Sequence, residues 1–359
     1  MTATTNPQFN DSTEAKDVAK AFASGIHGKT VLITGVNIKG IGFATAEAFA
    51  SQSAARIIVA GRTLSKLEES INALKAKYPN TDYRPVILDL SGQKAVRKAA
   101  ADVLSWQDVP SIDIVVNSAG IMNLPERTMN EDGIEMTLAS NHIGHFLFTF
   151  LIMPKILEAA KKNPKGVTRI VNVSSLSPAW GCMRWSDLSF EKINNTLPEA
   201  EQPDYNVMRM FGAEDPENKA YIPVAAYNQS KTANLLFSIG LTNRLYDAHG
   251  ILSFAVHPGV IKTELGRSYD DKATESLEQM VQDKVFTFKS LGAGAATSLV
   301  AAGDSSLGKP QVKNGKQNYG AWLQDCQITD QAAPLSESNE EAEKLWALSE
   351  KLVNEHFAW

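Results

Sequence analysis

The regular alternation of two kinds of segment restricts the fold of this chain more than any other feature of its sequence. Short runs rich in β-branched residues, such as TVLIT (30–34), RIIVAG (56–61) and VTRIVNVSS (167–175), alternate with longer stretches of helical periodicity. Apolar strands separated by helices pair in parallel, and right-handed crossovers then place helices on both faces of the sheet. The sequence therefore predicts a doubly wound parallel α/β sheet with helices on both faces.

The same rhythm predicts the domain organisation. We expect a single α/β domain over residues 28–320, because strands and helices alternate through most of that range. Residues 176–223 are rich in Pro, Asn, Glu and Met and break the alternation, so they are predicted to form an insertion. Residues 265–288 form a second irregular segment.

Two extensions are predicted to flank this domain. Residues 1–27 and residues 321–359 each carry one stretch of helical pattern. The N-terminal helix is predicted to begin with a capping box made by Asp11 and Glu14.

The composition excludes several classes of function. A net charge of -5 argues against nucleic acid as a principal partner, since phosphate binding needs clustered cations. Cys182 and Cys326 lie far apart and match no metal-ligand spacing, so no metal site is predicted and a reduced compartment is favoured. The N-terminus shows no secretory pattern, and the most apolar segment, residues 143–157, is too short to span a bilayer. We expect a cytoplasmic protein with no membrane span.

A glycine-rich loop, TGVNIKGIG (34–42), follows the first predicted strand. Its spacing, G-x4-G-x-G, differs from the common dinucleotide pattern G-x-G-x-x-G. Glycines before a helix N-terminus let a diphosphate approach unpaired backbone N–H groups and the positive end of the helix dipole. Tight packing of the strand against the helix, with no ligand, is the alternative explanation.

The end of the second predicted strand indicates which dinucleotide is bound. An acid at this point suits the ribose of NAD, whereas an arginine suits the 2'-phosphate of NADP. Arg62 stands there, and Lys39 in the glycine loop adds a second cation. The sequence therefore predicts NADP(H) over NAD(H), with a solvated loop cation as the alternative for Arg62.

Tyr227 and Lys231 are four residues apart and lie on one face of a predicted helix. A neighbouring ammonium group lowers the pKa of a phenol, which then serves as an acid or base near neutral pH. A Y-x-x-x-K pattern by itself is equally typical of a surface pair.

In this context the chain resembles the short-chain dehydrogenase/reductase family. The matching pieces occur in the family's order over about residues 28–302: TGVNIKGIG, AGR, LDL, NSAG, NHIGHF, IVNVSS, YNQSK and HPGVIKTEL. Within the family the chain is most similar to the branch of retinol dehydrogenases, the WW-domain oxidoreductase and related fungal and plant reductases. The resemblance implies a Rossmann-type fold and an NADP-dependent carbonyl reductase or alcohol dehydrogenase.

The resemblance also implies a role for each catalytic residue. Tyr227 would exchange a proton with the substrate oxygen, and Lys231 would lower the pKa of Tyr227 and hold the nicotinamide ribose. Ser175 would donate a hydrogen bond to the substrate oxygen. Asn141 would hold a water that links Lys231 to solvent.

The cofactor site is implied in the same way. Gly35, Gly40 and Gly42 would pack on the diphosphate, with Ile41 supplying a backbone N–H, while Asp89 would meet the adenine and Asn117 the adenosine side of the cleft. Pro258, Gly259, Val260 and Thr263 would line the nicotinamide carboxamide. Ser174, His142 and His257 are interpreted as structural.

Two departures from the family pattern concern the loop and the insertion. The glycine loop has one extra residue, and we expect residues 37–39 to bulge outward. The insertion and residues 265–288, on the substrate side, carry many aromatic and Met side chains, which form either a pocket for a bulky apolar substrate or a satellite core. These side chains are Trp180, Met183, Trp185, Phe190, Tyr205, Met208, Met210, Phe211, Leu277, Met280, Val285 and Phe286.

The expected function is therefore an NADP(H)-dependent interconversion of an alcohol with an aldehyde or ketone on a medium or large, mostly apolar molecule. A non-catalytic nucleotide-sensing or scaffold protein is one alternative, and double-bond reduction or epimerisation by the same residues is another. Relatives that form dimers or tetramers use the helices next to Asn141 and Tyr227. A homodimer is thus one expectation, unless the terminal extensions cover those helices.

Overall fold

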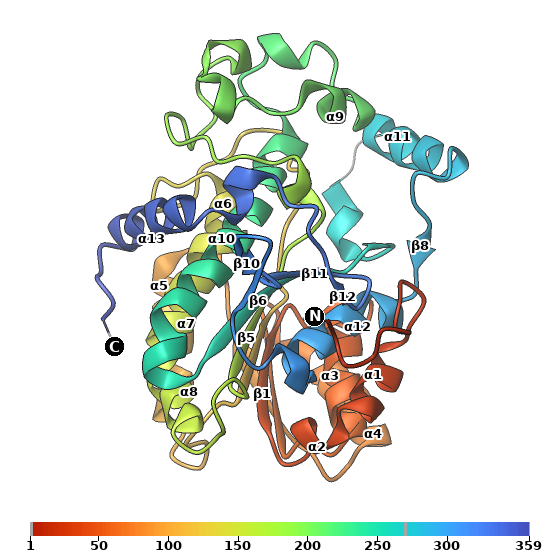
Figure 1. Cartoon of the computed structure of the whole chain (residues 1–359), viewed down its shortest axis with the longest axis vertical. Helices are drawn as coiled ribbons and strands as arrows, with labels where there is room; N and C mark the ends of the chain where they lie inside the picture. The colour runs from red at the N-terminus through yellow and green to blue at the C-terminus, as the bar shows by residue number, and fades with distance from the viewer. Residues whose placement is uncertain (1–2, 269–270, 359) are drawn as a thin grey trace.

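The central element is one eight-stranded sheet with the strand order β12-β11-β6-β5-β4-β1-β2-β3. The structure, a computed structural model, describes residues 3–268 and 271–358. Neighbouring strands pair in parallel throughout, except that β12 runs antiparallel to β11 at one edge. Figure 1 shows helices on both sides of this sheet. The predicted doubly wound fold is confirmed.

The strands of the sheet are β1 (Thr30–Thr34), β2 (Arg56–Gly61), β3 (Asp82–Ile87), β4 (Ile114–Asn117), β5 (Arg169–Val173), β6 (Leu252–His257), β11 (Trp322–Gln324) and β12 (Gln327–Ile328). Two small pairs lie outside it, β7 (Val260–Ile261) with β8 (Phe288–Lys289), and β9 (Gln311–Lys313) with β10 (Lys316–Tyr319).

The helices are α1 (Ala15–Ala21), α2 (Ala23–Ile26), α3 (Ile41–Ser51), α4 (Leu64–Lys77), α5 (Gln93–Ser105), α6 (Met136–Leu138), α7 (Gly144–Leu151), α8 (Met153–Ala160), α9 (Tyr205–Met210), α10 (Pro223–His249), α11 (Asp271–Gln282), α12 (Leu291–Gly303) and α13 (Asn339–Val353).

The central strands are buried on both faces, which explains their continuous apolar sequence. In β1 the side chain of Leu32 belongs to one core, whereas Val31 and Ile33 belong to the other. The first core lies among α5, α7, α10 and α13, and the second among α1, α3, α4 and α12. Two cores on opposite faces are the direct result of the βα alternation in the sequence.

The N-terminal segment is held by tertiary contacts rather than by the predicted capping box. Glu14 is the N-cap of α1, but its side chain makes no capping bond. It accepts a hydrogen bond from Ser290 Oγ at 2.5 Å instead. Thr5 is likewise bonded to Asp304. The capping-box prediction was wrong because α12 provides a partner that local sequence cannot reveal.

The sheet continues past residue 320, where the sequence placed the start of a C-terminal extension. The strand β11 pairs in parallel with β6, and β12 follows it in a tight antiparallel pair. The helix α13 then packs along α10, and Ser349 Oγ lies 2.8 Å from His142 Nε2. Residues 322–328 are therefore part of the central sheet.

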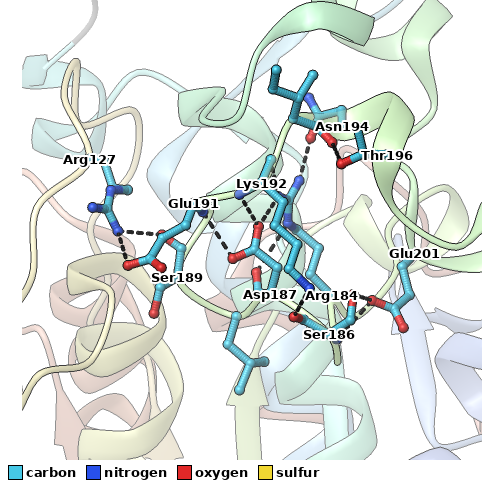
Figure 2. Close-up of polar contacts among 12 residues, drawn as sticks. Arg127, Arg184, Ser186, Asp187, Ser189, Glu191, Lys192, Asn194, Thr196 and Glu201 are labelled. Carbon is cyan, nitrogen blue, oxygen red and sulfur yellow. Dashed lines mark hydrogen bonds and ion pairs between the residues drawn. The ribbon is translucent and has the colours of Figure 1, made fainter.

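The insertion forms 3-10 turns and the short helix α9 above the carboxyl ends of the strands (Figure 1). The buried guanidinium of Arg184 organises this segment, and Figure 2 shows its bonds to Asp187, Asn194 and the Lys192 carbonyl. Burial alone would raise the pKa of Asp187. Hydrogen bonds from the Glu191 N–H and from Arg184 nevertheless bring that pKa below its ordinary value.

Over the described ranges 3–268 and 271–358, no single helix is both long and apolar enough to cross a membrane. One pair bent by 60°, Met136–Leu151 with Met153–Ala160, reaches the required length and composition only when taken together. Phe146 and Phe148 in this pair are fully buried in the core of the fold.

Candidate active site

A cavity of about 720 Å³ opens along the carboxyl ends of the parallel strands. Residues that follow β1, β2, β4, β5 and β6 all line it, among them Gly35, Arg62, Ala119, Ser175 and His257. In open α/β sheets this edge is where ligands bind, because the loops that diverge there leave a crevice.

The glycine loop forms one end of the cavity. Gly35 has φ +74°, and a Cβ atom there would lie 2.6 Å from Ala119 Cα. A Cβ atom on Gly42 would lie 2.7 Å from the Gly35 carbonyl oxygen. Gly40 caps α3, which begins at Ile41 with its first turn open to the cavity. These glycines are required for the close approach of strand, loop and helix.

The extra loop residue is accommodated where Lys39 turns outward. Lys39 is exposed and its side chain does not line the cavity, although Asn37 does. The prediction that Lys39 joins Arg62 is therefore not supported by the structure. Lys66, in the first turn of α4, lines the cavity with Arg62 and forms an ion pair with Glu264, another lining residue, at 2.8 Å.

Asp89 and Asn117 have different environments. Asp89 lines the cavity, and its carboxylate accepts hydrogen bonds from the backbone N–H of Ser91 at 3.0 Å and from Ser91 Oγ at 2.7 Å. Asn117 does not line the cavity. Its amide is buried at the end of β4 and donates to Asn172 Oδ1 at 2.8 Å and to Thr149 Oγ1 at 3.2 Å. The prediction for Asn117 was wrong, because this side chain is used in packing the sheet against α7.

The four residues proposed for catalysis converge at the middle of the site. Tyr227 and Lys231 lie on α10, with Lys231 Nζ 5.6 Å from the centre of the Tyr227 ring. Tyr227, Lys231 and Ser175 all line the cavity. Gly120 brings Asn141 close, because a Cβ atom at Gly120 would lie 3.3 Å from Asn141 Oδ1 and 3.5 Å from Lys231 Nζ.

Lys231 is almost completely buried, and its ammonium donates to the Val173 carbonyl at 2.8 Å. Burial lowers the pKa of Lys231 to about 7, because removal from water disfavours the charged form. A lysine that titrates near neutral pH in a cleft is typical of a functional site.

Asn141 lies in a π-helical turn, Ala139–Ile143, between α6 and α7. Its amide bonds to both backbone groups of Ile121, accepting at 2.8 Å and donating at 2.9 Å, and also donates to Ser230 Oγ at 2.9 Å. Single π turns within α-helices are frequently found at functional sites. Asn141 itself is fully buried and does not line the cavity, but it lies directly behind Gly120 and Ile121, which do.

Sequence reasoning did not identify two side chains beside Ser175. Ser175 Oγ donates to Ser177 Oγ at 2.6 Å, and Ser177 Oγ donates to Asn228 Oδ1 at 2.7 Å. All three residues line the cavity. The only available signal was the position of Asn228 directly after Tyr227, which indicates nothing until the helix is packed.

The loop after β6 forms the next wall. Pro258, Gly259, Val260 and Thr263 line the cavity as predicted from the family pattern. A Cβ atom on Gly259, where φ is +84°, would lie 2.6 Å from Lys289 Cδ, so Lys289 crosses directly over this backbone. Lys289 forms an ion pair with Asp325, which ties β8 to the end of β11.

The aromatic and Met residues divide between the two predicted alternatives. The satellite-core alternative holds for Phe190 and Met208, which are buried in a small core of the insertion. Met183 is buried in the main core. Cavity lining is provided by Trp180, Met210, Phe211, Leu277, Met280, Val285 and Phe286. The cavity thus has an apolar mouth built from two separate segments.

Three histidines are buried, and of these His257 lines the cavity. Burial lowers the pKa of His142 to about 3 and the pKa of His257 to about 4. His145 has a pKa of about 4 for the same reason, and its Nε2 lies 2.9 Å from Thr34 Oγ1. These values agree with the structural interpretation of His142 and His257.

The residues present fit a dinucleotide. The helix N-terminus of α3 and the glycine loop provide backbone N–H groups, and Arg62 and Lys66 provide positive charge. Asn37 Oδ1 and His257 Nδ1 are buried atoms of cavity-lining residues, and within residues 3–268 and 271–358 neither has a hydrogen-bond partner.

Comparisons with known proteins identify the family of this chain. A family model for short chain dehydrogenases matches residues 29–186. The oxidoreductase fscI of Fusarium equiseti is 36% identical over 252 residues, which cover 70% of this chain and 94% of that protein. Retinol dehydrogenase 13 of Homo sapiens is 31% identical over 332 residues, which cover 91% of this chain and 85% of that protein.

A solved structure supports the same assignment. An uncharacterised protein from Mycobacterium paratuberculosis is 26% identical and aligns with a TM-score of 0.57, covering 93% of this chain and 96% of that one. Relatives above 30% identity are matched over most of their length. The chain therefore belongs to the short-chain dehydrogenase/reductase family, oxidoreductases that bind a nicotinamide cofactor.

Proposed function

We propose that this protein is an NADP(H)-dependent oxidoreductase that interconverts an alcohol with an aldehyde or ketone on a medium or large, mostly apolar molecule. The observation that carries the proposal is the meeting of Tyr227, Ser175 and Lys231 in one cavity that Arg62 and many apolar side chains also line. A complete set of catalytic side chains does not favour a non-catalytic scaffold.

A bound nicotinamide supplies or accepts the hydride. Side chains of the protein donate the proton to the substrate oxygen and stabilise the negative charge that develops on it. The Tyr227 hydroxyl donates a proton to this oxygen during reduction, and the buried Lys231 ammonium stabilises the resulting phenolate. Ser175 donates a hydrogen bond to the same oxygen, where negative charge develops. Asn141 is proposed to hold the water through which Lys231 exchanges protons with solvent.

The preference for NADP(H) is supported by the charge at the end of β2. Arg62 lines the cavity directly after β2, and no acid stands between β2 and α4. Lys66 lines the cavity as well and forms an ion pair with Glu264 at 2.8 Å. An arginine at the end of β2 pairs with a 2'-phosphate, whereas a carboxylate would repel it. Asp89 is proposed to contact the adenine.

The apolar mouth supports a lipophilic substrate. Met210 and Phe211 approach from the insertion, and Leu277 and Met280 approach from α11. Apolar and Met side chains at a cavity mouth bind apolar molecules of varied shape. The human relative is named for retinol, which is an apolar alcohol.

The test is NADPH oxidation with a panel of lipophilic aldehydes and ketones, comparing the native protein with Tyr227→Phe. We expect turnover of at least one carbonyl, and a loss of about 10²- to 10⁴-fold in kcat without the phenol. Binding of NADPH should be nearly unchanged. Unchanged turnover in Tyr227→Phe would refute the assignment, and product analysis would identify double-bond reduction.

A further inference from the structure

A chain of three hydrogen-bonded side chains leads from Ser175 to α10. Ser177 Oγ donates to Asn228 Oδ1, so the one proton of the Ser177 hydroxyl is committed to Asn228. Ser177 Oγ therefore accepts from Ser175, whose own proton points toward Ser177. The Ser177 backbone N–H donates to Ser175 Oγ at 3.0 Å. The proton of Ser175 is thus directed away from a substrate oxygen in this arrangement.

Catalysis requires the opposite direction. Ser175 stabilises negative charge on the substrate oxygen only when it donates its proton to that oxygen. Each hydroxyl has one proton, so Ser177 must then donate to Ser175 and must accept from another donor. Asn228 can provide that donor, because a half-turn of its amide replaces Oδ1 by Nδ2 at the same position.

The surroundings of Asn228 permit this turn. Among the residues that the structure describes, Asn228 Nδ2 donates to no protein acceptor, so the turn breaks no other bond. Ser177 and Asn228 are both buried, at 3% and 6% exposure, so only a small part of each side chain is open to the cavity that both line. In buried surroundings, hydrogen bonds that form a chain polarise one another, so the hydroxyl at the end of the chain becomes a stronger donor.

We propose that Ser177 and Asn228 are positioning residues that set the direction and the donor strength of the Ser175 hydroxyl. Before the substrate binds, the chain runs from Ser175 to Asn228. With the substrate oxygen in place it runs from Asn228 through Ser177 and Ser175 to that oxygen. No covalent bond changes, because two hydroxyl groups and one amide rotate. The catalytic part of this inference rests on the proposed function.

The first experiment measures steady-state reduction by Ser177→Ala and Asn228→Leu, with the best carbonyl of the panel and NADPH. We expect each substitution to lower kcat by about tenfold, the value of one net hydrogen bond, and to leave NADPH binding unchanged. Ser177→Thr retains the hydroxyl and should retain most of the activity. Asn228→Asp keeps the shape but removes the amide donor, and should behave like Asn228→Leu.

Repeating both substitutions in a protein that lacks the Ser175 hydroxyl tests whether Ser177 and Asn228 act through that hydroxyl or through a general effect on the structure. In Ser175→Ala, the two further substitutions should cause no additional loss of kcat, because the hydroxyl they orient is absent. A full additional tenfold loss in that background, or native kcat in the single variants, would overturn the proposal.

A second measurement does not depend on activity. The shifts in urea midpoint caused by Ser177→Ala and Asn228→Leu should be clearly non-additive in the double variant, since both remove the same hydrogen bond. Additive shifts would refute the chain itself. If the native protein reduces no carbonyl but the shifts are non-additive, the proposed function fails while the hydrogen-bonded chain stands.

Discussion

At the scale of single residues, the proposed preference for NADP(H) depends on Arg62. Arg62→Gln should weaken NADPH binding by about 10- to 100-fold, because a hydrogen bond between charged groups contributes roughly 1.5–3 kcal/mol. NADH affinity should hardly change. Fluorescence titration of both cofactors measures this, and Lys39→Gln is the matched control because Lys39 lies outside the cavity. Equal effects on both cofactors would contradict the role of Arg62.

The lowered pKa of Lys231 should make the stability of the fold depend on pH. Burial lowers the pKa of Lys231 to about 7 in the folded protein, from an ordinary value of 10.5. Between these values the unfolded chain binds more protons, so stability should rise with pH above about 7, by up to about 1.4 kcal/mol per pH unit. Urea unfolding at pH 7, 8 and 9 measures the slope. In Lys231→Met the part of this slope that comes from the lysine should be missing. An identical slope in the native protein and in Lys231→Met would contradict the prediction.

At the scale of elements, the insertion is held together by a buried ion pair. Arg184 and Asp187 are nearly inaccessible, and the Arg184 N–H also donates to Gln229 on α10, so the pair fixes the insertion above the active site (Figure 2). Asp187→Asn should destabilise the protein by about 3–5 kcal/mol, because the guanidinium stays buried without its counter-charge. The substrate KM should rise.

An exposed ion pair between the insertion and the loop before α6 is the matched control. Figure 2 shows Glu191 in contact with Arg127. The two charged groups lie 3.1 Å apart and both side chains are exposed, so Glu191→Gln should change the free energy of unfolding by less than about 1 kcal/mol. Urea unfolding compares the two variants. Similar destabilisation in both would mean that the buried pair does not hold the insertion.

At the scale of the whole molecule, α13 covers the helices that relatives are expected to use for association. Trp346 packs on Phe146 and Phe150, with ring centres 5.6 and 5.0 Å away, and the Arg244 guanidinium lies 3.8 Å above its ring. A Cβ atom on Gly240 would lie only 3.1 Å from the Trp346 ring. The chain's own helix therefore occupies this face of α7 and α10.

We accordingly expect a monomer rather than a homodimer through this face. Light scattering after size exclusion should give the mass of one chain. Trp346→Ala should cost roughly 3–5 kcal/mol of stability, because it removes a large buried ring, and it should raise the tendency to associate. A stable dimer of the native protein with α13 at its interface would contradict this expectation.

The sequence by itself determined the features that depend on local pattern. Alternating apolar strands predicted the sheet, and the glycines, Arg62 and the Tyr227/Lys231 spacing predicted where a dinucleotide and a proton donor would lie, because each signal lies within one turn or one strand end. Only the tertiary structure decided which side chains face the cavity. Lys39 is exposed outside the cavity, Asn117 packs inside the sheet, and Lys66 lines the cavity in an ion pair with Glu264. The tertiary structure also links Ser175, Ser177 and Asn228 by hydrogen bonds and pairs β11 with β6. Contacts of this kind, between residues far apart in sequence, form only when the elements pack.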